Sequence, residues 1–295
     1  MNKLIERLSQ PGVLVADGAT GTMLQQAGLP AGAPSELWVL ENPAGVQALH
    51  RSYIQAGSDV ILTDTFGGTR IKLAKSGLGE RAAEISTAAA RLARQVAGER
   101  IFVLGDIGPT GALIAPFGPL SREEAVSAFA EQARALAAGG VDAILIETMS
   151  DLTEATAAVE GARQATDLPV LVTMSFESHG RTMMGVKPAK AARELAGLGV
   201  NAIGANCGRT LSENLAAIEE IRQAAPDAVL VAKPNAGLPR LEDSETVFDV
   251  QPEVMAEYAV KFAALGVKML GACCGSTPAH IQAIAAALHA ASQPG

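Results

Sequence analysis

Short apolar runs alternate with longer helical stretches along the whole chain. The apolar runs are continuous rather than alternating, which is typical of parallel strands that are covered on both faces. The eight expected strands span residues 13–19, 60–67, 101–111, 143–151, 169–177, 201–208, 229–237 and 267–275. The helical stretches that follow them span residues 43–56, 80–98, 121–138, 152–166, 188–198, 211–224, 252–265 and 278–291. The pattern therefore contains eight βα units.

Local signals support several of these helix boundaries. Ser121 with Glu124 three residues later predicts a capping box at a helix start. Gly139, Gly199 and Gly266 each follow a helical stretch, where glycine commonly ends a helix.

The number and order of these units predict the fold class. Eight parallel units in 295 residues are typical of a (β/α)8 TIM barrel. We expect one α/β domain over residues 1–295, with its functional site at the mouth formed by the carboxyl ends of the strands. A doubly wound open sheet is the alternative, and it would place a site at a single switch point.

Charge and composition exclude some classes of partner. The net charge is -8 and only 3% of residues are aromatic, which argues against nucleic acids and anionic membrane surfaces. Residues 1–12 lack the apolar core of a signal peptide, and no apolar run approaches the ~18 residues of a membrane span. We expect a cytoplasmic protein with no nucleic-acid or membrane partner. In such a reducing compartment, three cysteines indicate metal binding, catalysis or burial rather than disulfides.

Polar residues gather where the expected strands end. They are Asp17, Asp64, Thr65, Asp106, Glu147, Glu177, Asn206, Cys207, Asn235, Cys273 and Cys274. In a barrel these ends meet at the mouth, where the chemistry of the fold takes place. Cys207 ends the sixth strand and the adjacent pair Cys273 and Cys274 ends the eighth, so we expect the three thiols to converge.

Three converging thiols predict a zinc site. Thiolates suit Zn²⁺, and three protein ligands leave one coordination position open, as in catalytic sites. The alternatives are cysteines that act as small buried hydrophobes, or a vicinal disulfide that would leave Cys207 out. A zinc ion with three thiolates is suited to binding a fourth sulfur and keeping it as a thiolate. The implied chemistry is alkyl transfer to sulfur.

Five motifs at separate strand ends carry a resemblance to a known family. They are "DGATGTML" (17–24), "ETMSD" (147–151), "GANCG" (204–208), "KPNAGLP" (233–239) and "GACCGSTPAHI" (271–281). Together they resemble the zinc-dependent homocysteine S-methyltransferases. This family includes betaine-homocysteine methyltransferase, the S-methylmethionine-dependent enzymes and the homocysteine module of cobalamin-dependent methionine synthase. The resemblance covers essentially the whole chain.

The resemblance implies an activity and a set of site residues. It implies transfer of a methyl group to the thiolate of L-homocysteine, which forms methionine. By resemblance, the zinc ligands and catalytic cysteines are Cys207, Cys273 and Cys274. Glu147 then contacts the substrate amino group, Asp17 and Gly18 hold the amino-acid end, and Asn235 lies beside the metal.

The chemistry of these residues agrees with those roles. Asp17 and Glu147 offer two carboxylates to an ammonium group, and the turn that begins at Gly18 offers backbone N–H groups to a carboxylate. The alternative for each acid is a solvated carboxylate at the rim or a helix N-cap. Asn235 has the alternative of holding a turn through its own backbone.

The methyl donor is left open by the sequence. The candidates are small molecules, namely S-methylmethionine, betaine or another onium compound, and a methylcorrinoid carried by a separate protein. We expect a corrinoid route to need partner chains, because the chain has no second domain for cobalamin or folate. The "PNAGLP" motif favours the methionine synthase module, whereas the length of the chain favours a small-molecule donor.

Two other functions compete with methyl transfer. Lys233 ends the seventh expected strand, and a buried lysine with a lowered pKa is the nucleophile of Schiff-base aldolases. That hypothesis leaves all three cysteines without a role, and the alternative for Lys233 is an ion pair with an acid at the rim. A zinc-binding or homocysteine-binding homologue without catalysis is the second competitor. The role of Arg209 after the "NCG" motif is also open.

Overall fold

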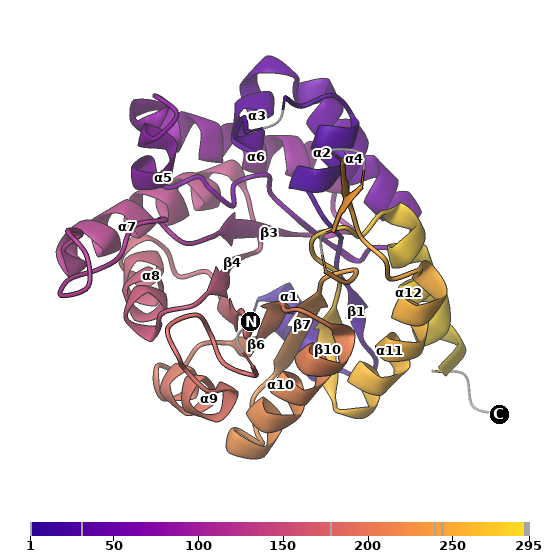
Figure 1. Ribbon diagram of the computed structural model, residues 1–295. Helices are drawn as coiled ribbons and strands as arrows, with labels where there is room; N and C mark the ends of the chain where they lie inside the picture. Colours follow the sequence, from indigo (N-terminus) through magenta and orange to yellow (C-terminus); the bar gives the residue numbers. More distant parts are fainter. Residues whose placement is uncertain (1, 31, 178, 239, 243–244, 292–295) are drawn as a thin grey trace.

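The computed structural model describes residues 2–30, 32–177, 179–238, 240–242 and 245–291. In this part of the chain, eight parallel strands form one sheet in the order β1-β10-β7-β6-β5-β4-β3-β2. A parallel bridge between Ala16 and Val60 joins the two outermost strands, so the sheet closes on itself. The helices surround the closed sheet (Figure 1). The predicted (β/α)8 barrel is therefore confirmed, and the open sheet is excluded.

The eight strands lie where the apolar runs predict them, although all eight are shorter. They are β1 (Leu14–Val15), β2 (Val60–Leu62), β3 (Phe102–Ile107), β4 (Ala143–Met149), β5 (Val170–Met174), β6 (Ala202–Cys207), β7 (Leu230–Pro234) and β10 (Val267–Leu270). The predicted ranges extend into the loops that follow each strand, because those loops begin with further small or apolar residues.

The eight predicted helices are also present. They are α4 (Pro43–Gln55), α6 (Ala82–Ala97), α7 (Arg122–Gly139), α8 (Leu152–Ala165), α9 (Pro188–Gly197), α10 (Leu211–Ala224), α11 (Pro252–Ala264) and α12 (Pro278–Ala291). The Ser121 and Glu124 capping box is confirmed at the start of α7. The glycine that ends α7 is Gly140, with φ 95°, whereas the predicted Gly139 is the last helical residue.

Several short elements are missing from the sequence prediction. They are α1 (Lys3–Ser9), α2 (Gly21–Gln26), η1 (Ser35–Leu37), α3 (Trp38–Glu41), α5 (Arg70–Ala74), η2 (Gly79–Arg81) and the antiparallel pair β8 (Arg240–Glu242) and β9 (Glu245–Val247). Helices of three to seven residues have too few turns for a periodic pattern. None of the described helices is long and apolar enough to cross a membrane.

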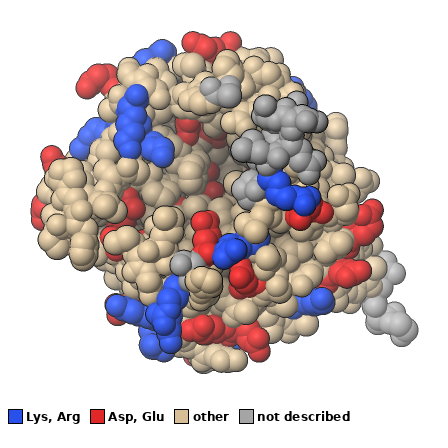
Figure 2. Space-filling model, in the orientation of Figure 1, with Lys and Arg blue, Asp and Glu red and all other residues tan. Residues whose placement is uncertain are grey.

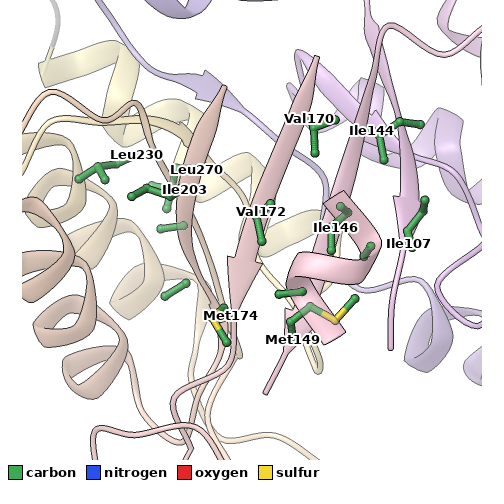
Figure 3. Packing of buried hydrophobic residues seen from close by; sticks show 14 of the residues in the cluster. Ile107, Ile144, Ile146, Met149, Val170, Val172, Met174, Ile203, Leu230 and Leu270 are labelled. Atoms are coloured by element: carbon green, nitrogen blue, oxygen red, sulfur yellow. The ribbon is translucent and has the colours of Figure 1, made fainter. Parts of the chain in front are cut away.

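The strands separate two apolar layers. Alternate residues such as Leu104, Leu145 and Val231 point into the barrel, where Leu4 and Leu8 of α1 pack against them and close the amino end. The intervening residues point outward against the helices, and Figure 3 shows part of this layer, including Ile144, Ile146, Val170 and Val172.

The inward-facing side chains change from apolar to polar at the carboxyl ends of the strands. Two residues beyond Leu104, Leu145, Leu171 and Val231, and two residues beyond Gly204 on β6, the next inward side chain is polar. These buried polar residues are Asp106 on β3, Glu147 on β4, Thr173 on β5, Asn206 on β6 and Lys233 on β7. The strand pattern therefore builds an apolar barrel floor with a polar layer above it.

Candidate metal and substrate site

A cavity of about 590 Å³ opens above this polar layer at the mouth of the barrel. Figure 2 shows it as a hollow in the middle of the face, with acidic side chains on its walls. The lining residues include Gly18, Asp64, Asp106 and Glu147, and also Lys233. The sulfur atoms of all three cysteines border the same cavity, so the candidate site is a single pocket.

The three thiols converge as the sequence predicts. The ligand sulfur atoms of Cys207, Cys273 and Cys274 all lie within 4.8 Å of one another. The Sγ atoms of Cys207 and Cys273 are 3.3 Å apart. Cys207 is buried, Cys273 is half-buried and Cys274 is exposed, so the cluster faces the cavity from one wall.

The order of the strands explains this convergence. β7 lies between β6, which ends at Cys207, and β10, which precedes Cys273. The turn after β7 forms backbone hydrogen bonds with both cysteine segments. Asn235 N donates to Cys207 O at 3.2 Å, and Cys273 N donates to Pro234 O at 2.8 Å. The backbone of this turn therefore holds the two cysteine segments against each other.

The backbone at Cys207 is unusual for a residue with a side chain. Its φ is 54°, in the left-handed region that only a few per cent of non-glycine residues adopt. Such conformations cost about 1–3 kcal/mol, and they persist where surrounding contacts impose them, often at functional sites. Asn214 Nδ2 supplies one such contact, since it donates to Cys207 O at 3.1 Å.

The three thiols differ in pKa. Hydrogen bonds from Cys207 and Cys273 lower the pKa of Cys274 to about 4. Hydrogen bonds with the other two cysteines, followed by burial, raise the pKa of Cys207 well above its ordinary value. The bond with Cys207 lowers the pKa of Cys273, but Cys274 and burial outweigh it and raise that pKa to about 12. Of the three thiols, Cys274 is therefore the one whose pKa most favours the thiolate.

The geometry and the donor set fit a zinc ion. Two thiolates bound to one tetrahedral zinc at 2.3 Å lie about 3.8 Å apart. The observed cluster spans 3.3 Å for its Cys207–Cys273 pair and at most 4.8 Å for any pair, which brackets this value. Soft sulfur donors select zinc over calcium or magnesium. These three residues are a group that can hold a metal ion.

Two buried carboxyl groups face the cavity beside the thiols. Glu147 Oε2 and Asp106 Oδ1 have no hydrogen-bond partner in the described part of the chain, although both residues are more than nine-tenths buried. Burial raises the pKa of Glu147 to about 8, against a smaller opposing effect of Lys233. Burial, and then Glu147, raise the pKa of Asp106 well above its ordinary value. A bound ammonium group would supply the partner that both oxygens lack.

Lys233 forms a buried ion pair with Asp17. Its Nζ lies 3.0 Å from Asp17 Oδ1, and both side chains are at most 3% exposed. Burial lowers the pKa of Lys233, but Asp17 and Glu147 outweigh burial, so this pKa lies above its ordinary value. A Schiff-base lysine needs the opposite shift, because the amine must lose its proton to attack a carbonyl. The geometry therefore favours the ion-pair alternative over the aldolase.

The side chain of Asp17 is fully engaged within the protein. Its Oδ2 accepts from Leu62 N at 2.7 Å, while Oδ1 faces Lys233. The residues that line the cavity include Gly18 but not Asp17. A ligand in the cavity would therefore meet the backbone that follows Asp17 rather than the Asp17 side chain.

A polar contact joins the turn at Gly18 to the cysteine loop. Ser276 Oγ accepts from Ala19 N at 3.0 Å and donates to Cys273 O at 2.8 Å. Tyr53 Oη donates to Ala19 O at 2.7 Å from the other side. A Cβ at Gly18 would lie only 2.5 Å from Ser276 Oγ, so glycine is required for this close packing.

Asn235 lies behind the thiols rather than in the wall of the cavity. Its Nδ2 donates to Gly208 O at 2.9 Å, which braces the turn that follows Cys207. Its Oδ1 has no partner among the described residues. The structure thus brings together the three cysteines, Glu147 and Gly18, with Asn235 supporting them.

The sequence motifs give no role to Asp106, and the ion pair that they offer Lys233 with an acid at the rim does not identify Asp17 as the partner. Asp106 ends an apolar run like the other strand-end acids, but nothing in the motifs distinguishes it from a rim carboxylate. Asp106 lies two residues after Leu104, so both side chains point to the inward face of β3. This spacing is the sequence signal that distinguishes Asp106 from a rim carboxylate.

The barrel and its mouth define the class of protein as an enzyme of the (β/α)8 type, with a group that can hold a metal beside buried carboxyl groups. The particular family follows from comparison with known proteins. The family model described as homocysteine S-methyltransferase matches residues 14–288, so the chain belongs to that family. The predicted family and enzyme class, a methyltransferase, are confirmed.

Curated relatives and solved structures agree with this assignment. The chain is 34% identical over 303 residues to a methionine synthase of Mycobacterium leprae, covering 97% of this chain and 25% of that protein. It is 34% identical over 309 residues to a methionine synthase of Mycobacterium tuberculosis, covering 99% and 26%. The chain thus spans about a quarter of the length of these relatives.

The fold is shared with a homocysteine methyltransferase of known structure. The metallated form of MmuM from Escherichia coli has a TM-score of 0.80 and 23% identity, over 95% of this chain and 97% of that one. Its oxidized form has a TM-score of 0.79 and 24% identity over the same shares. At this level of identity, the likeness supports the fold alone.

Proposed function

We propose that the protein transfers a methyl group to the thiolate of L-homocysteine in a zinc-dependent reaction that forms methionine. The observation that carries this proposal is the convergence of three thiols, within 4.8 Å of one another, on the cavity that Glu147 and Asp106 also face. The similar curated proteins are methionine synthases, and the structural neighbour is a homocysteine methyltransferase, which supports the proposal.

Cys207, Cys273 and Cys274 would hold the zinc ion as thiolates. The bound ion would supply one open position for the substrate sulfur and would keep that sulfur as a thiolate near neutral pH. Because three thiolates already exceed the charge of Zn²⁺, the buried ammonium of Lys233 contributes a compensating positive charge to the polar layer.

The amino-acid end of homocysteine would lie over the polar layer. Glu147 would accept hydrogen bonds from its ammonium group, and Asp106 is close enough to share this role. The backbone after Asp17, at Gly18, would face the substrate carboxylate. Asp17 would act indirectly by holding Lys233, and Asn235 by bracing the turn beside Cys207.

Methyl transfer requires the donor on the far side of the methyl group from the attacking sulfur. The sulfur uses an electron pair to form the new S–CH₃ bond, and the donor leaves with the electrons of the bond that breaks. The cavity extends from the thiols to Asp64 on the β2 side, opposite β6 in the closed sheet. This side would take either a small onium donor or the methylcorrinoid of a separate protein.

Removal and replacement of the metal test the proposal. We expect the purified protein to bind one zinc ion and to form methionine from homocysteine with one of the donors. Changing any one of the cysteines to alanine should abolish transfer and weaken zinc binding by more than the 10–100-fold typical of changes around the ligands. Chelation should have the same effect, and zinc should reverse it.

The assay should offer S-methylmethionine, betaine and a methylcorrinoid in turn, with zinc content measured on the same samples. Full transfer activity in a metal-free variant without the three cysteines would refute the proposed function. Trapping of a carbonyl substrate on Lys233 by borohydride would instead support the aldolase.

A further inference from the structure

Asn206 is a fully buried residue whose side-chain amide is completely used. Its Oδ1 accepts from Thr148 N at 2.8 Å and from Thr173 Oγ1 at 2.7 Å. Its Nδ2 donates to Thr148 Oγ1 at 2.6 Å and to Cys207 Sγ at 3.4 Å. An amide has two acceptor and two donor positions, so none is left over.

These partners determine which end of the amide faces the sulfur. The backbone N–H of Thr148 can only donate, so the atom opposite it must be the amide oxygen. The nitrogen of Asn206 therefore points at Cys207 Sγ. A thiolate is a much better acceptor for this N–H group than a neutral thiol, because hydrogen bonds to charged groups are the stronger ones.

The left-handed backbone of Cys207 makes this contact possible. Successive side chains of a strand point to opposite faces, which would direct Cys207 away from its neighbour Asn206. With φ 54°, Cys207 departs from the extended conformation and its sulfur comes to the amide. Thr148 has a φ of 61° directly after Glu147, and Asn206 bonds to both its N–H and its hydroxyl.

The structure assigns Asn206 as a positioning residue for the thiolate of Cys207. Its N–H group fixes the direction of the sulfur and draws negative charge from it. Through Thr148, the same side chain also holds the irregular end of β4 that follows Glu147. This inference rests on the proposed function, because it concerns the thiolate form of Cys207 that would bind the metal.

Thr173 anchors the amide from the strand between the two others. β5 lies between β4, which carries Thr148, and β6, which carries Asn206. The hydroxyl of Thr173 reaches Oδ1 within the fully buried layer. Three adjacent strands therefore fix one amide, so that its donor stays directed at the sulfur.

Replacement of Asn206 by aspartate tests this role with little change in shape. In Asn206→Asp the acceptor for Thr148 N and Thr173 Oγ1 remains, but the N–H groups that face Cys207 Sγ and Thr148 Oγ1 are lost. We expect zinc affinity, measured by competition with a chelator, to fall about 10–100-fold. In the cobalt-substituted protein, the sulfur-to-cobalt charge-transfer band should move to longer wavelength, because more charge stays on the sulfur.

A control for the loss of an amide lies just before the same strand, at the exposed residue Asn201. Asn201 uses its Oδ1 to accept from Val170 N at 2.9 Å and makes the same kind of cap without a sulfur partner. Asn201→Asp should keep the zinc affinity and the cobalt band of the unchanged protein. An Asn206→Asp protein that matches this control in both measurements would overturn the inference.

If Asn206→Asp does not fold, a second variant tests the same role. Thr173→Val removes one anchor of the amide while the donor and the sulfur stay in place. We expect a smaller loss of zinc affinity and a cobalt band shifted in the same direction. A folded Thr173→Val protein with unchanged affinity and spectrum would count against the role of Asn206. Failure of the unchanged protein to bind zinc would instead refute the proposed function.

Discussion

Burial sets the protonation of the residues at the site. Burial raises the pKa of Glu147 to about 8 and the pKa of Asp106 well above its ordinary value, because burial removes the water that would stabilise their charges. Lys233 keeps its charge in the same layer, because Asp17 lies 3.0 Å from its amine. A bound ammonium group would stabilise the charged carboxylate of Glu147, which burial alone disfavours.

Glu147→Gln tests the ammonium contact at the scale of one residue. Glutamine keeps the shape of the side chain but cannot carry the negative charge that stabilises a bound ammonium. The loss of one charge-assisted hydrogen bond predicts a 10- to 100-fold higher Kd for homocysteine, measured by calorimetry on the zinc-loaded protein. Zinc affinity should stay the same.

Glu177→Gln is the control for this change. Glu177 also follows an apolar strand, but it accepts from Ser175 Oγ at 2.6 Å and does not line the cavity. Homocysteine affinity should be unchanged in that variant. Equal loss of affinity in both variants would mean that Glu147 acts only through general electrostatics.

At the scale of elements, the loops after β1 and β10 form one packed unit. Ser276 links the Ala19 backbone to the Cys273 backbone, and Tyr53 of α4 supports Ala19 from behind. Gly18 fits between these side chains without space for a Cβ. The position of the cysteine loop therefore depends on the turn that faces the cavity more than 250 residues earlier in the chain.

Gly18→Ala tests this coupling between the two loops. The added methyl group would force Ser276 or Tyr53 to move, and overpacking of this kind costs about 1–3 kcal/mol. We expect a lower Tm together with weaker zinc binding, because the hydrogen bond to Cys273 O is disturbed. Thermal melting and chelator competition measure the two effects.

Gly21→Ala provides the comparison within the same loop. A Cβ at Gly21 meets no atom within 4 Å, and Gly21 is the first residue of α2. Alanine should leave zinc affinity unchanged there and should be neutral or slightly stabilising. Normal zinc binding in a folded Gly18→Ala protein would contradict the coupling.

At the scale of the whole molecule, barrel closure creates a dry mouth that holds several acids. Asp64 on the β2 side is 2% exposed, and burial, with a further contribution from Glu36, raises its pKa to about 8. An unfolded chain loses this proton near pH 4. Between those values the folded state holds more protons than the unfolded state, so the Asp64 contribution to stability falls as pH rises.

Asp64→Asn isolates that contribution. Near pH 4 the two proteins should be similar in stability, and by pH 8 the asparagine variant should be the more stable by several degrees in Tm. The reason is that the buried asparagine never has to ionise, while its oxygen can still accept from Ser35 Oγ. Melting curves across this range check the sign, and a difference that stays constant with pH would contradict it.

The sequence by itself determined the barrel and the identity of the thiol cluster. Continuous apolar runs followed by helical stretches repeat eight times, and burial on both faces of a strand leaves few other folds for such a pattern. Because all strand ends of a barrel meet at its mouth, the positions of Cys207 and of the pair at 273 and 274 in the sequence are enough to place them together. Family motifs then gave Glu147 and the glycine turn.

Only the tertiary structure decided the partners of these residues. The pairing of Asp17 with Lys233 joins positions 216 residues apart, and it depends on the order of strands around the closed sheet. The contact between Asn206 and the Cys207 sulfur depends on a left-handed φ that no local pattern signals in a residue with a side chain. The periodicity of the sequence identifies the face of a strand on which a residue lies. The charge and the hydrogen bonds of that residue depend on distances across the barrel, which only the folded structure determines.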